Sequence, residues 1–364
     1  MNPQQDLNRL AWWHWVAPLG GAVLVAAKAL ALLGLDNGPL IALAAALLGG
    51  AVFAAVHHAE VLATRIGEPF GSILLALAIT IIEVGLIVGL LVSGAAGSDA
   101  VARDTVFSVI MIVLNGIVGL CLVVGAAHHH EQEFRVQGAT GILSVIATLA
   151  IVALVFPKFT VTTPGPTFAS SQLLFVDIAS LGLYALFIYV QTVRHREHFL
   201  IEDGLAHHGE PPTGRATLVS GVLLVLSVVV VIFLAKGLSP TVETTVALAG
   251  LPPTVVGVVI AMVVLLPEGV TAVKAARRNR LQTSLNASLG SALASIGLTI
   301  PIVGVLSIYL GVPLVLGLSN EATALLLLTL FVSTLTFATG RTTILQGGVH
   351  LVIFGLFLMI TAVP

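Results

Sequence analysis

Long apolar runs separated by short polar segments dominate the pattern of this chain. Eleven such runs of roughly 17–25 residues follow one another, and each can cross about 30 Å of hydrocarbon as an α-helix. They lie at about 16–35, 40–63, 69–92, 105–127, 138–156, 170–191, 216–236, 252–273, 284–310, 312–338 and 343–362. The ninth and tenth runs are divided by a short break at Gly311–Pro313. The pattern predicts an all-α integral membrane protein with about 11 transmembrane helices.

The basic residues predict which helix ends face the cytoplasm. With the N-terminus in the cytoplasm, eleven of the fifteen Lys and Arg residues fall on cytoplasmic segments, four of them between Lys274 and Arg280. Arg103, Lys158 and Lys236 fall outside. An odd number of spans then leaves the C-terminus on the opposite side of the membrane.

The helix count also suggests an internal duplication, because eleven helices divide into one leading helix and two groups of five. The longest polar stretch lies between the sixth and seventh runs, where a linker between repeats belongs. We expect an N-terminal segment and leading helix over 1–36, repeat one over 37–193, a polar cytoplasmic linker over 194–215 and repeat two over 216–364. Five helices per repeat force the two copies into opposite orientations, and such inverted repeats place a transport site near the midplane between them.

Two glutamates lie deep inside apolar runs, at matching positions in the second helix of each predicted repeat. Glu83 lies in Ile73–Leu91 and Glu268 in Val255–Val273, directly after Pro267. A charged acid near a bilayer centre costs about 3 kcal/mol on insertion scales, and such residues usually mark an ion or proton pathway. A proline inside a span frees a backbone carbonyl. These features predict a cation/proton transporter.

Further oxygen-bearing residues share faces with these glutamates or lie on the helices that follow them. Thr80 lies one turn before Glu83, and Asn115 lies in the next helix. A stripe of hydroxyls follows Glu268, with Ser291 and Ser295 at its centre. Carboxylate, amide and hydroxyl oxygens suit hard cations. For the serines, close helix packing is an equally open interpretation.

The remaining polar residues carry less information. Asp177 and Glu321 fall near the outer ends of their helices, where an entrance role and simple solvation are both open, and Glu243 is expected in an external loop. Histidines such as His57 and His58 fall near predicted cytoplasmic ends, where we expect them to be solvated.

Composition excludes other classes of protein. Only 9% of residues are charged, against about 25% in soluble domains. The sequence has no basic patch with interleaved aromatic residues, which is the pattern that would predict nucleic-acid binding. An intramembrane metalloenzyme would need a metal cage, but we note no histidine near mid-span and Cys121 is the single cysteine. We therefore expect a protein that is not an enzyme, has no cofactor and has the lipid bilayer, cations and protons as partners. A passive cation channel remains an alternative that only flux coupling separates from an antiporter.

Three segments together resemble the cation/proton exchanger family, and within it the bacterial Cha-type calcium(sodium)/proton antiporters. They are AEVLATRIGEPFGSILLALAITIIEV (59–84), LLPEGVTAVKAARRNR (265–280) and SLGSALASIGLTIP (288–301). The resemblance covers nearly the whole chain. It implies a protein of a bacterial inner membrane that exports Ca²⁺, Na⁺ or K⁺ in exchange for protons by alternating access.

The resemblance also implies roles for individual residues. Each repeat of that family carries a Gly-Asn-Ala-x-Glu motif whose glutamate binds the cation or a proton, and these glutamates correspond to Glu83 and Glu268. Asn115 resembles the asparagine of the following helix. Thr80 and Leu265 stand where the family's motif has asparagine. This departure leaves room for an antiporter of Na⁺ or K⁺ that does not transport Ca²⁺.

Overall fold

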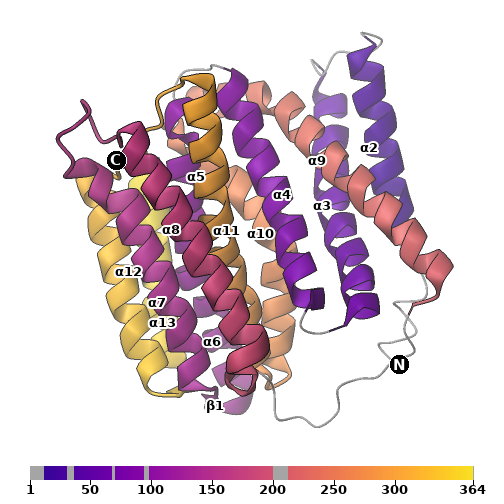
Figure 1. The fold of residues 1–364 in the computed structure, drawn as a ribbon. Helices are drawn as coiled ribbons and strands as arrows, with labels where there is room; N and C mark the ends of the chain where they lie inside the picture. Colours follow the sequence, from indigo (N-terminus) through magenta and orange to yellow (C-terminus); the bar gives the residue numbers. More distant parts are fainter. Residues whose placement is uncertain (1–11, 31–36, 68–69, 94–97, 200–211, 364) are drawn as a thin grey trace. The chain divides into compact units, whose positions relative to one another are not determined.

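The computed structural model describes residues 12–30, 37–67, 70–93, 98–199 and 212–363. Within these residues the helices form eleven rods, as the apolar runs predict, and nine of them are long and apolar enough to cross a membrane (Figure 1). The rods are α2 (Trp13–Ala29); α3 (Gly38–Ile66); α4 (Phe70–Ser93); η1 (Ser98–Ala100) with α5 (Val101–Met111), η2 (Ile112–Ile117) and α6 (Val118–His129); α7 (Val136–Ala150) with η3 (Ile151–Val155) and η4 (Phe156–Lys158); α8 (Ser170–Tyr189) with η5 (Val190–Arg194) and η6 (Arg196–His198); α9 (Gly214–Leu248); α10 (Thr254–Arg277); α11 (Leu281–Leu310); α12 (Asn320–Ala338); and α13 (Ile344–Ala362). Residues 1–11 and 31–36 of the expected leading segment, and 200–211 of the expected linker, lie outside the described residues.

The predicted tenth helix was wrong over its first eight residues. The preceding helix α11 stops at Gly311, whose φ of 66° lies in the left-handed region that glycine adopts without a Cβ penalty. The chain then runs extended, and the backbone N–H of Val315 donates to the carbonyl of Asp99 at 3.0 Å. A new helix starts only after Ser319, whose side chain accepts a hydrogen bond from the first turn.

The predicted seventh helix is longer than its apolar run. The helix α9 continues through Pro240 to Leu248, so Glu243 lies in a helix and not in a loop. Ser239 Oγ donates to Glu243 Oε1 at 2.7 Å, one turn along the same face. A proline removes one backbone bond, and polar side chains bonded within the helix let it continue.

Contacts divide the chain into two compact units, 1–89 with 203–248 and 90–202 with 249–364. In the first unit α3 packs along α9, and α2 packs against both. Small residues allow these close approaches: Gly21 of α2 faces Val230 of α9, and Gly50 of α3 faces Ala17 of α2.

Among the described residues of the first unit, His14 and His58 are buried and His57 is half-buried, contrary to the solvated position expected for His57 and His58. His58 is fully buried; its Nδ1 lies 3.3 Å from Ser220 Oγ, and its Nε2 lies 3.4 Å from the carbonyl of His14. The rings of His14 and His57 stack with centroids 3.7 Å apart. Ser220 of α9 and His14 of α2 therefore contact these histidines in place of the water that the sequence pattern predicts around them.

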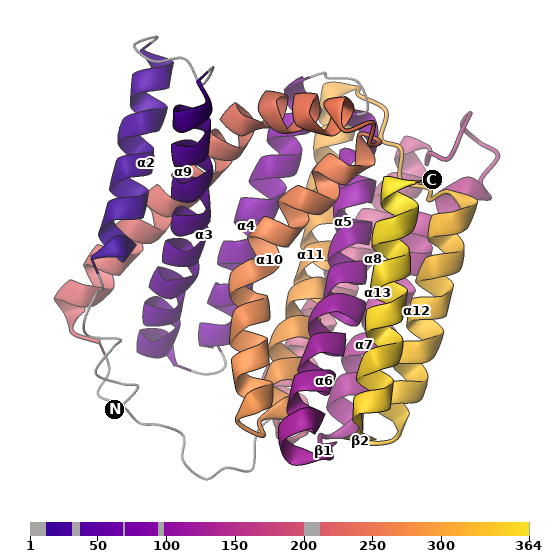
Figure 2. The ribbon, with the colours of Figure 1, turned by 180° about the vertical axis from the view of Figure 1, so that it is seen from behind.

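The second unit is built around the rod Val101–His129, most of which is buried. The helices α10, α11 and α13 pack against this rod, and α6 and α13 run side by side (Figure 2). Gly347 permits the approach of α6 to α13, because a Cβ at this position would lie 2.7 Å from the backbone nitrogen of Val123.

Turns that the positive-inside pattern places on one side of the membrane lie together in the second unit. The strands β1 (Gln132–Glu133) and β2 (Arg341–Thr342) pair antiparallel, with Gln132 opposite Thr342. Gln132 Nε2 also donates to the carbonyl of Ala276 at 2.9 Å, at the end of α10. The turns that follow α6, α10 and α12 thus form one end of this unit.

Candidate functional site

Glu83 and Thr80 lie on one buried face of α4 in the first unit. The side chains are 5% and 3% exposed, respectively. Thr80 Oγ donates to the carbonyl of Ala76 at 2.9 Å, one turn back in the same helix. The hydroxyl proton of Thr80 therefore takes part in a hydrogen bond within α4. The lone pairs of the same oxygen remain as possible ligands for a cation.

Glu268 lies in the second unit on α10, directly after the buried Pro267. The next residue, Gly269, packs against the side chain of Ile117 in η2, and a Cβ at Gly269 would meet Ile117 at 3.5 Å. This contact brings the turn that carries Glu268 beside the π-helical segment that holds Asn115. Pro267 lacks an N–H, so one backbone carbonyl in the preceding turn loses its helical partner.

Asn115 is the centre of a buried polar network. Its side chain is fully buried in η2, where the helix widens into a π-helix, a feature common at functional positions. Asn115 Nδ2 donates to Thr329 Oγ1 of α12 at 2.9 Å, and Oδ1 lies 3.1 Å from His350 Nδ1 of α13. His350 Nε2 in turn lies 3.1 Å from Thr336 Oγ1 of α12.

The chemistry of this network follows from its donors and acceptors. An amide oxygen can only accept, so His350 Nδ1 donates to Asn115, and Nε2 can accept from Thr336 when the ring carries this one proton. The oxygen of Asn115 keeps a second lone pair. It can therefore hold His350 and still act as a cation ligand.

The sequence analysis missed the partners of Asn115. His350 is fully buried in α13, so the argument that no histidine lies in the middle of a span was wrong. The signal was present, because His350 is the only ionisable residue in 344–362. Thr329 and Thr336 are ordinary hydroxyls in an apolar run, and their role emerges only from the packing of α12.

The hydroxyl stripe on α11 is buried along its length, with Ser291 8% and Ser295 2% exposed. Its five members are Ser284, Ser288, Ser291, Ser295 and Thr299. Among the described residues, the hydroxyls of Ser288 and Thr299 have no hydrogen-bond partner. Buried hydroxyls without partners are costly unless something binds them. Ser288 and Thr299 can therefore offer hydroxyl oxygens to a ligand inside the second unit.

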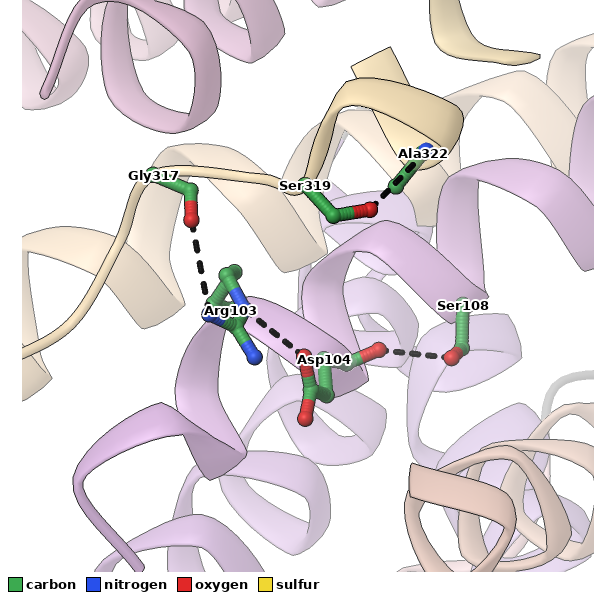
Figure 3. A network of polar contacts seen from close by, with 6 residues as sticks. All are labelled: Arg103, Asp104, Ser108, Gly317, Ser319 and Ala322. Carbon is green, nitrogen blue, oxygen red and sulfur yellow. Dashed lines mark hydrogen bonds and ion pairs between the residues drawn. The ribbon is translucent and has the colours of Figure 1, made fainter. Parts of the chain in front are cut away.

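A cavity of about 470 Å³ lies in the second unit among the first turns of α5, α10 and α12 and the last turns of α13. Asp104, Ser108 and Glu321 supply oxygen atoms to its wall, and Arg103 is the basic residue there. Arg103 Nε donates to Asp104 Oδ1 at 2.7 Å, and Ser108 Oγ donates to the carbonyl of Asp104 at 2.6 Å (Figure 3).

Apolar side chains line this cavity on the same helical rods that carry the Asn115 network. Phe107, Leu325 and Phe357 line the cavity, and the two phenyl rings meet edge to face with centroids 5.7 Å apart. Thr329 follows Leu325 by one turn of α12, and His350 precedes Phe357 by two turns of α13.

The predicted site residues thus divide between the two units. Thr80 and Glu83 belong to the first unit, whereas Asn115, Glu268, Ser291 and Ser295 belong to the second. Of the two acids whose role the sequence left open, Glu321 is exposed and lines the cavity. Asp177 is 1% exposed, so solvation at a helix end is wrong for this residue.

Comparisons with known proteins show the family of this chain. Residues 39–193 and 219–363 both match the model of one family, described as sodium/calcium exchanger protein. A Sinorhizobium fredii protein named "Putative ionic transporter y4hA" is 51% identical over 97% of this chain and 96% of its own length. The sodium-potassium/proton antiporter ChaA of Escherichia coli is 35% identical over 86% of this chain and 87% of its own length.

Solved structures show the same fold. The structure of native YfkE has a TM-score of 0.74 with this chain, at 18% identity, and the alignment covers 96% of this chain and all of that one. An H⁺/Ca²⁺ exchanger, CAX, gives a TM-score of 0.66 at 17% identity, covering 95% of this chain and 88% of that one.

Proposed function

This chain belongs to the sodium/calcium exchanger protein family, and on that premise we propose that it is a secondary active antiporter that exports Ca²⁺ in exchange for protons, with Na⁺ and K⁺ as further substrates. The observation that carries the proposal is a glutamate in the second helix of each family match: Glu83, which is buried, and Glu268, which is half-buried. The cation is the substrate, and Thr80, Asn115, Ser291 and Ser295 are the proposed further ligands.

The choice of cations follows from the oxygen donors and from the relatives. Carboxylates suit Ca²⁺, which takes six to eight oxygen ligands. A 22% identical protein of Bacillus subtilis, which covers 53% of this chain, is named a Ca²⁺/H⁺ antiporter. The more similar Escherichia coli relative is named for Na⁺ and K⁺. Thr80 replaces one amide of the family motif with a hydroxyl, and Leu265 replaces the other with an apolar side chain, so one oxygen fewer is offered to Ca²⁺.

The exchange cycle rests on two carboxyls that hold either protons or a cation. A cation from the cytoplasm displaces the protons of Glu83 and Glu268 and is held by the carboxylates and neighbouring oxygens. It leaves on the far side, protons from that side replace it, and the neutral form returns. Two acids acting on one ion titrate as a coupled pair, so an exchange of one cation for one or two protons fits.

We further propose two inverted five-helix repeats and a location in the bacterial inner membrane, with the N-terminus in the cytoplasm. The two separate family matches, 39–193 and 219–363, support the duplication. The distribution of Lys and Arg supports the orientation.

The test is cation-dependent collapse of a preformed proton gradient in everted membrane vesicles. Ca²⁺, Na⁺ and K⁺ are added separately to vesicles with wild type, Glu83→Gln or Glu268→Gln. We expect Ca²⁺ to collapse the gradient in the wild type and neither variant to respond. Glu243→Gln, which changes an exposed acid of α9, is the matched control and should behave as wild type.

Each alternative gives a different result. A response to Na⁺ or K⁺ without Ca²⁺ would replace the proposed substrate while keeping the mechanism. Cation flux that proceeds without proton movement would instead identify a passive channel. Full exchange in both glutamine variants would refute the roles of Glu83 and Glu268.

A further inference from the structure

A buried carboxyl that the proposed exchange site does not use lies at the contact between α8 and α11 in the second unit. Asp177 is the eighth residue of α8 and is 1% exposed. Its carboxyl lies directly over Gly304 of α11: a Cβ on Gly304 would come within 2.5 Å of Oδ1 and 2.7 Å of Cγ. The glycine thus makes the space that the carboxyl occupies.

Neither oxygen of Asp177 has a hydrogen-bond partner among the described residues, although both atoms are buried. An ionised carboxylate in such a position has lost its hydration and gained nothing in exchange, which is strongly unfavourable. A neutral carboxylic acid avoids most of this cost because it carries no net charge. The packing therefore suits the protonated form of this side chain.

The elements that pack against α8 supply no counter-charge. On α11 the single titratable residue is Tyr309, which is 84% exposed. On the rod from α7 to η4 the single titratable residue is Lys158, whose Nζ donates to Asn320. On α8 and η5 themselves the other titratable residues are Tyr184, Tyr189 and Arg194; Tyr184 lies against Gly297, two turns of α11 before Gly304, and Arg194 is exposed at the opposite end of the rod.

We propose that Asp177 binds a proton at the contact of α8 with α11, as a third carboxyl proton site besides Glu83 and Glu268, and that loss of this proton separates the two helices at Gly304. The ionised form needs water or a cation beside it, and the close contact with Gly304 leaves no room for either. Release of the proton therefore requires the contact to open.

Opening of this contact would act on the candidate ligands of the second unit. The helix α11 carries Ser291 and Ser295 as well as Gly304, so a shift at its outer half changes the position of the hydroxyl stripe. Asp177 would then couple proton concentration to the arrangement of these hydroxyls. This consequence for exchange rests on the proposed function, whereas the binding of the proton does not.

Infrared spectroscopy of the purified full chain in lipid tests the proton site without transport. The C=O stretching band of a protonated carboxyl is followed during a pH titration of Glu83→Gln/Glu268→Gln, in which the two glutamates no longer contribute. We expect a protonated-carboxyl band in this double variant and its loss when Asp177→Asn is added. An unchanged band after the addition of Asp177→Asn would overturn the proposal.

Two further variants keep the test decisive. Glu321→Gln makes the same carboxyl-to-amide change at an exposed site and should leave the band assigned to Asp177 unchanged. If Asp177→Asn does not fold, Gly304→Ala retains the carboxyl but displaces it from its place on α11. The band should then shift in frequency, and a band identical to that of the parent would refute the placement.

Exchange measurements test the consequence separately. With wild-type activity established, Asp177→Asn should retain cation-dependent exchange but show a flatter dependence of rate on pH than the wild type. A pH profile that matches the wild type would refute the coupling to the hydroxyl stripe and leave the proton site to the infrared result. Absence of exchange in the wild type would instead refute the proposed function.

Discussion

The hydrogen bond between Asn115 and His350 should couple the stabilities of η2 and α13. The perturbation is a double-mutant cycle of Asn115→Ala, His350→Ala and the combined variant. Loss of the amide alone leaves two fully buried groups, His350 Nδ1 and Thr329 Oγ1, without their hydrogen-bond partner on Asn115. Each unsatisfied buried group costs about 1–3 kcal/mol, so Asn115→Ala should lower the free energy of unfolding by about 2–6 kcal/mol.

The coupling term is smaller than the cost of either single variant. Hydrogen bonds between membrane helices average about 0.6 kcal/mol in double-mutant cycles, with a maximum of about 1.7 kcal/mol. The Asn115–His350 contact is 3.1 Å long and lies between fully buried side chains, which places it in the upper part of that range. We expect a coupling energy of about 1 kcal/mol.

Reversible unfolding of the purified protein in mixed micelles by increasing SDS measures each corner of the cycle. A control cycle pairs Asn115→Ala with Thr148→Ala, an exposed residue whose hydroxyl bonds to its own helix. Those two changes should add within about 0.3–0.5 kcal/mol. If the free-energy changes of Asn115→Ala and His350→Ala add as closely as those of the control pair, the hydrogen bond does not couple η2 to α13 and the prediction is refuted.

Two further predictions follow from packing and from the hydroxyl stripe. Gly347→Ala should destabilise the protein by about 1–3 kcal/mol through overpacking against Val123, whereas Gly348→Ala, with open space around its Cβ, should be neutral or slightly stabilising in the same unfolding assay. The double change Ser291→Ala/Ser295→Ala should raise the cation concentration for half-maximal exchange in vesicles, while the exposed Ser144→Ala should not; equal values for the two variants would assign the stripe to packing alone.

Hydrophobic patterning predicts the helices of this fold well, because each span must satisfy its backbone hydrogen bonds within one apolar helical segment. It fails where helix length depends on polar partners. The chain around Pro313 looks like the start of a span, yet Val315 finds its backbone partner at Asp99 and the helix begins after Ser319. Conversely, α9 outlasts its apolar run as far as Leu248.

The candidate site is predictable to the extent that a residue stands out along the chain. Glu83 and Glu268 stand out because an acid in an apolar run is rare. Asn115 stands out because an amide is also unusual in an apolar run. Its partners do not stand out, since Thr329 is one of many hydroxyl residues in the membrane helices. Which side chains meet depends on the rotation of α12 and α13 about their axes, and the sequence pattern of these largely apolar helices does not encode it clearly.

Burial alone does not identify the groups that exchange protons; the partners available to the charged form do. Asn115 and Asp177 are both buried in the second unit. Asn115 donates to Thr329 and accepts from His350, so its environment is complete in the neutral state that an amide always keeps. Asp177 faces a glycine and has no hydrogen-bond partner among the described residues. Because only the carboxyl can change charge, burial makes Asp177, and not Asn115, sensitive to protons.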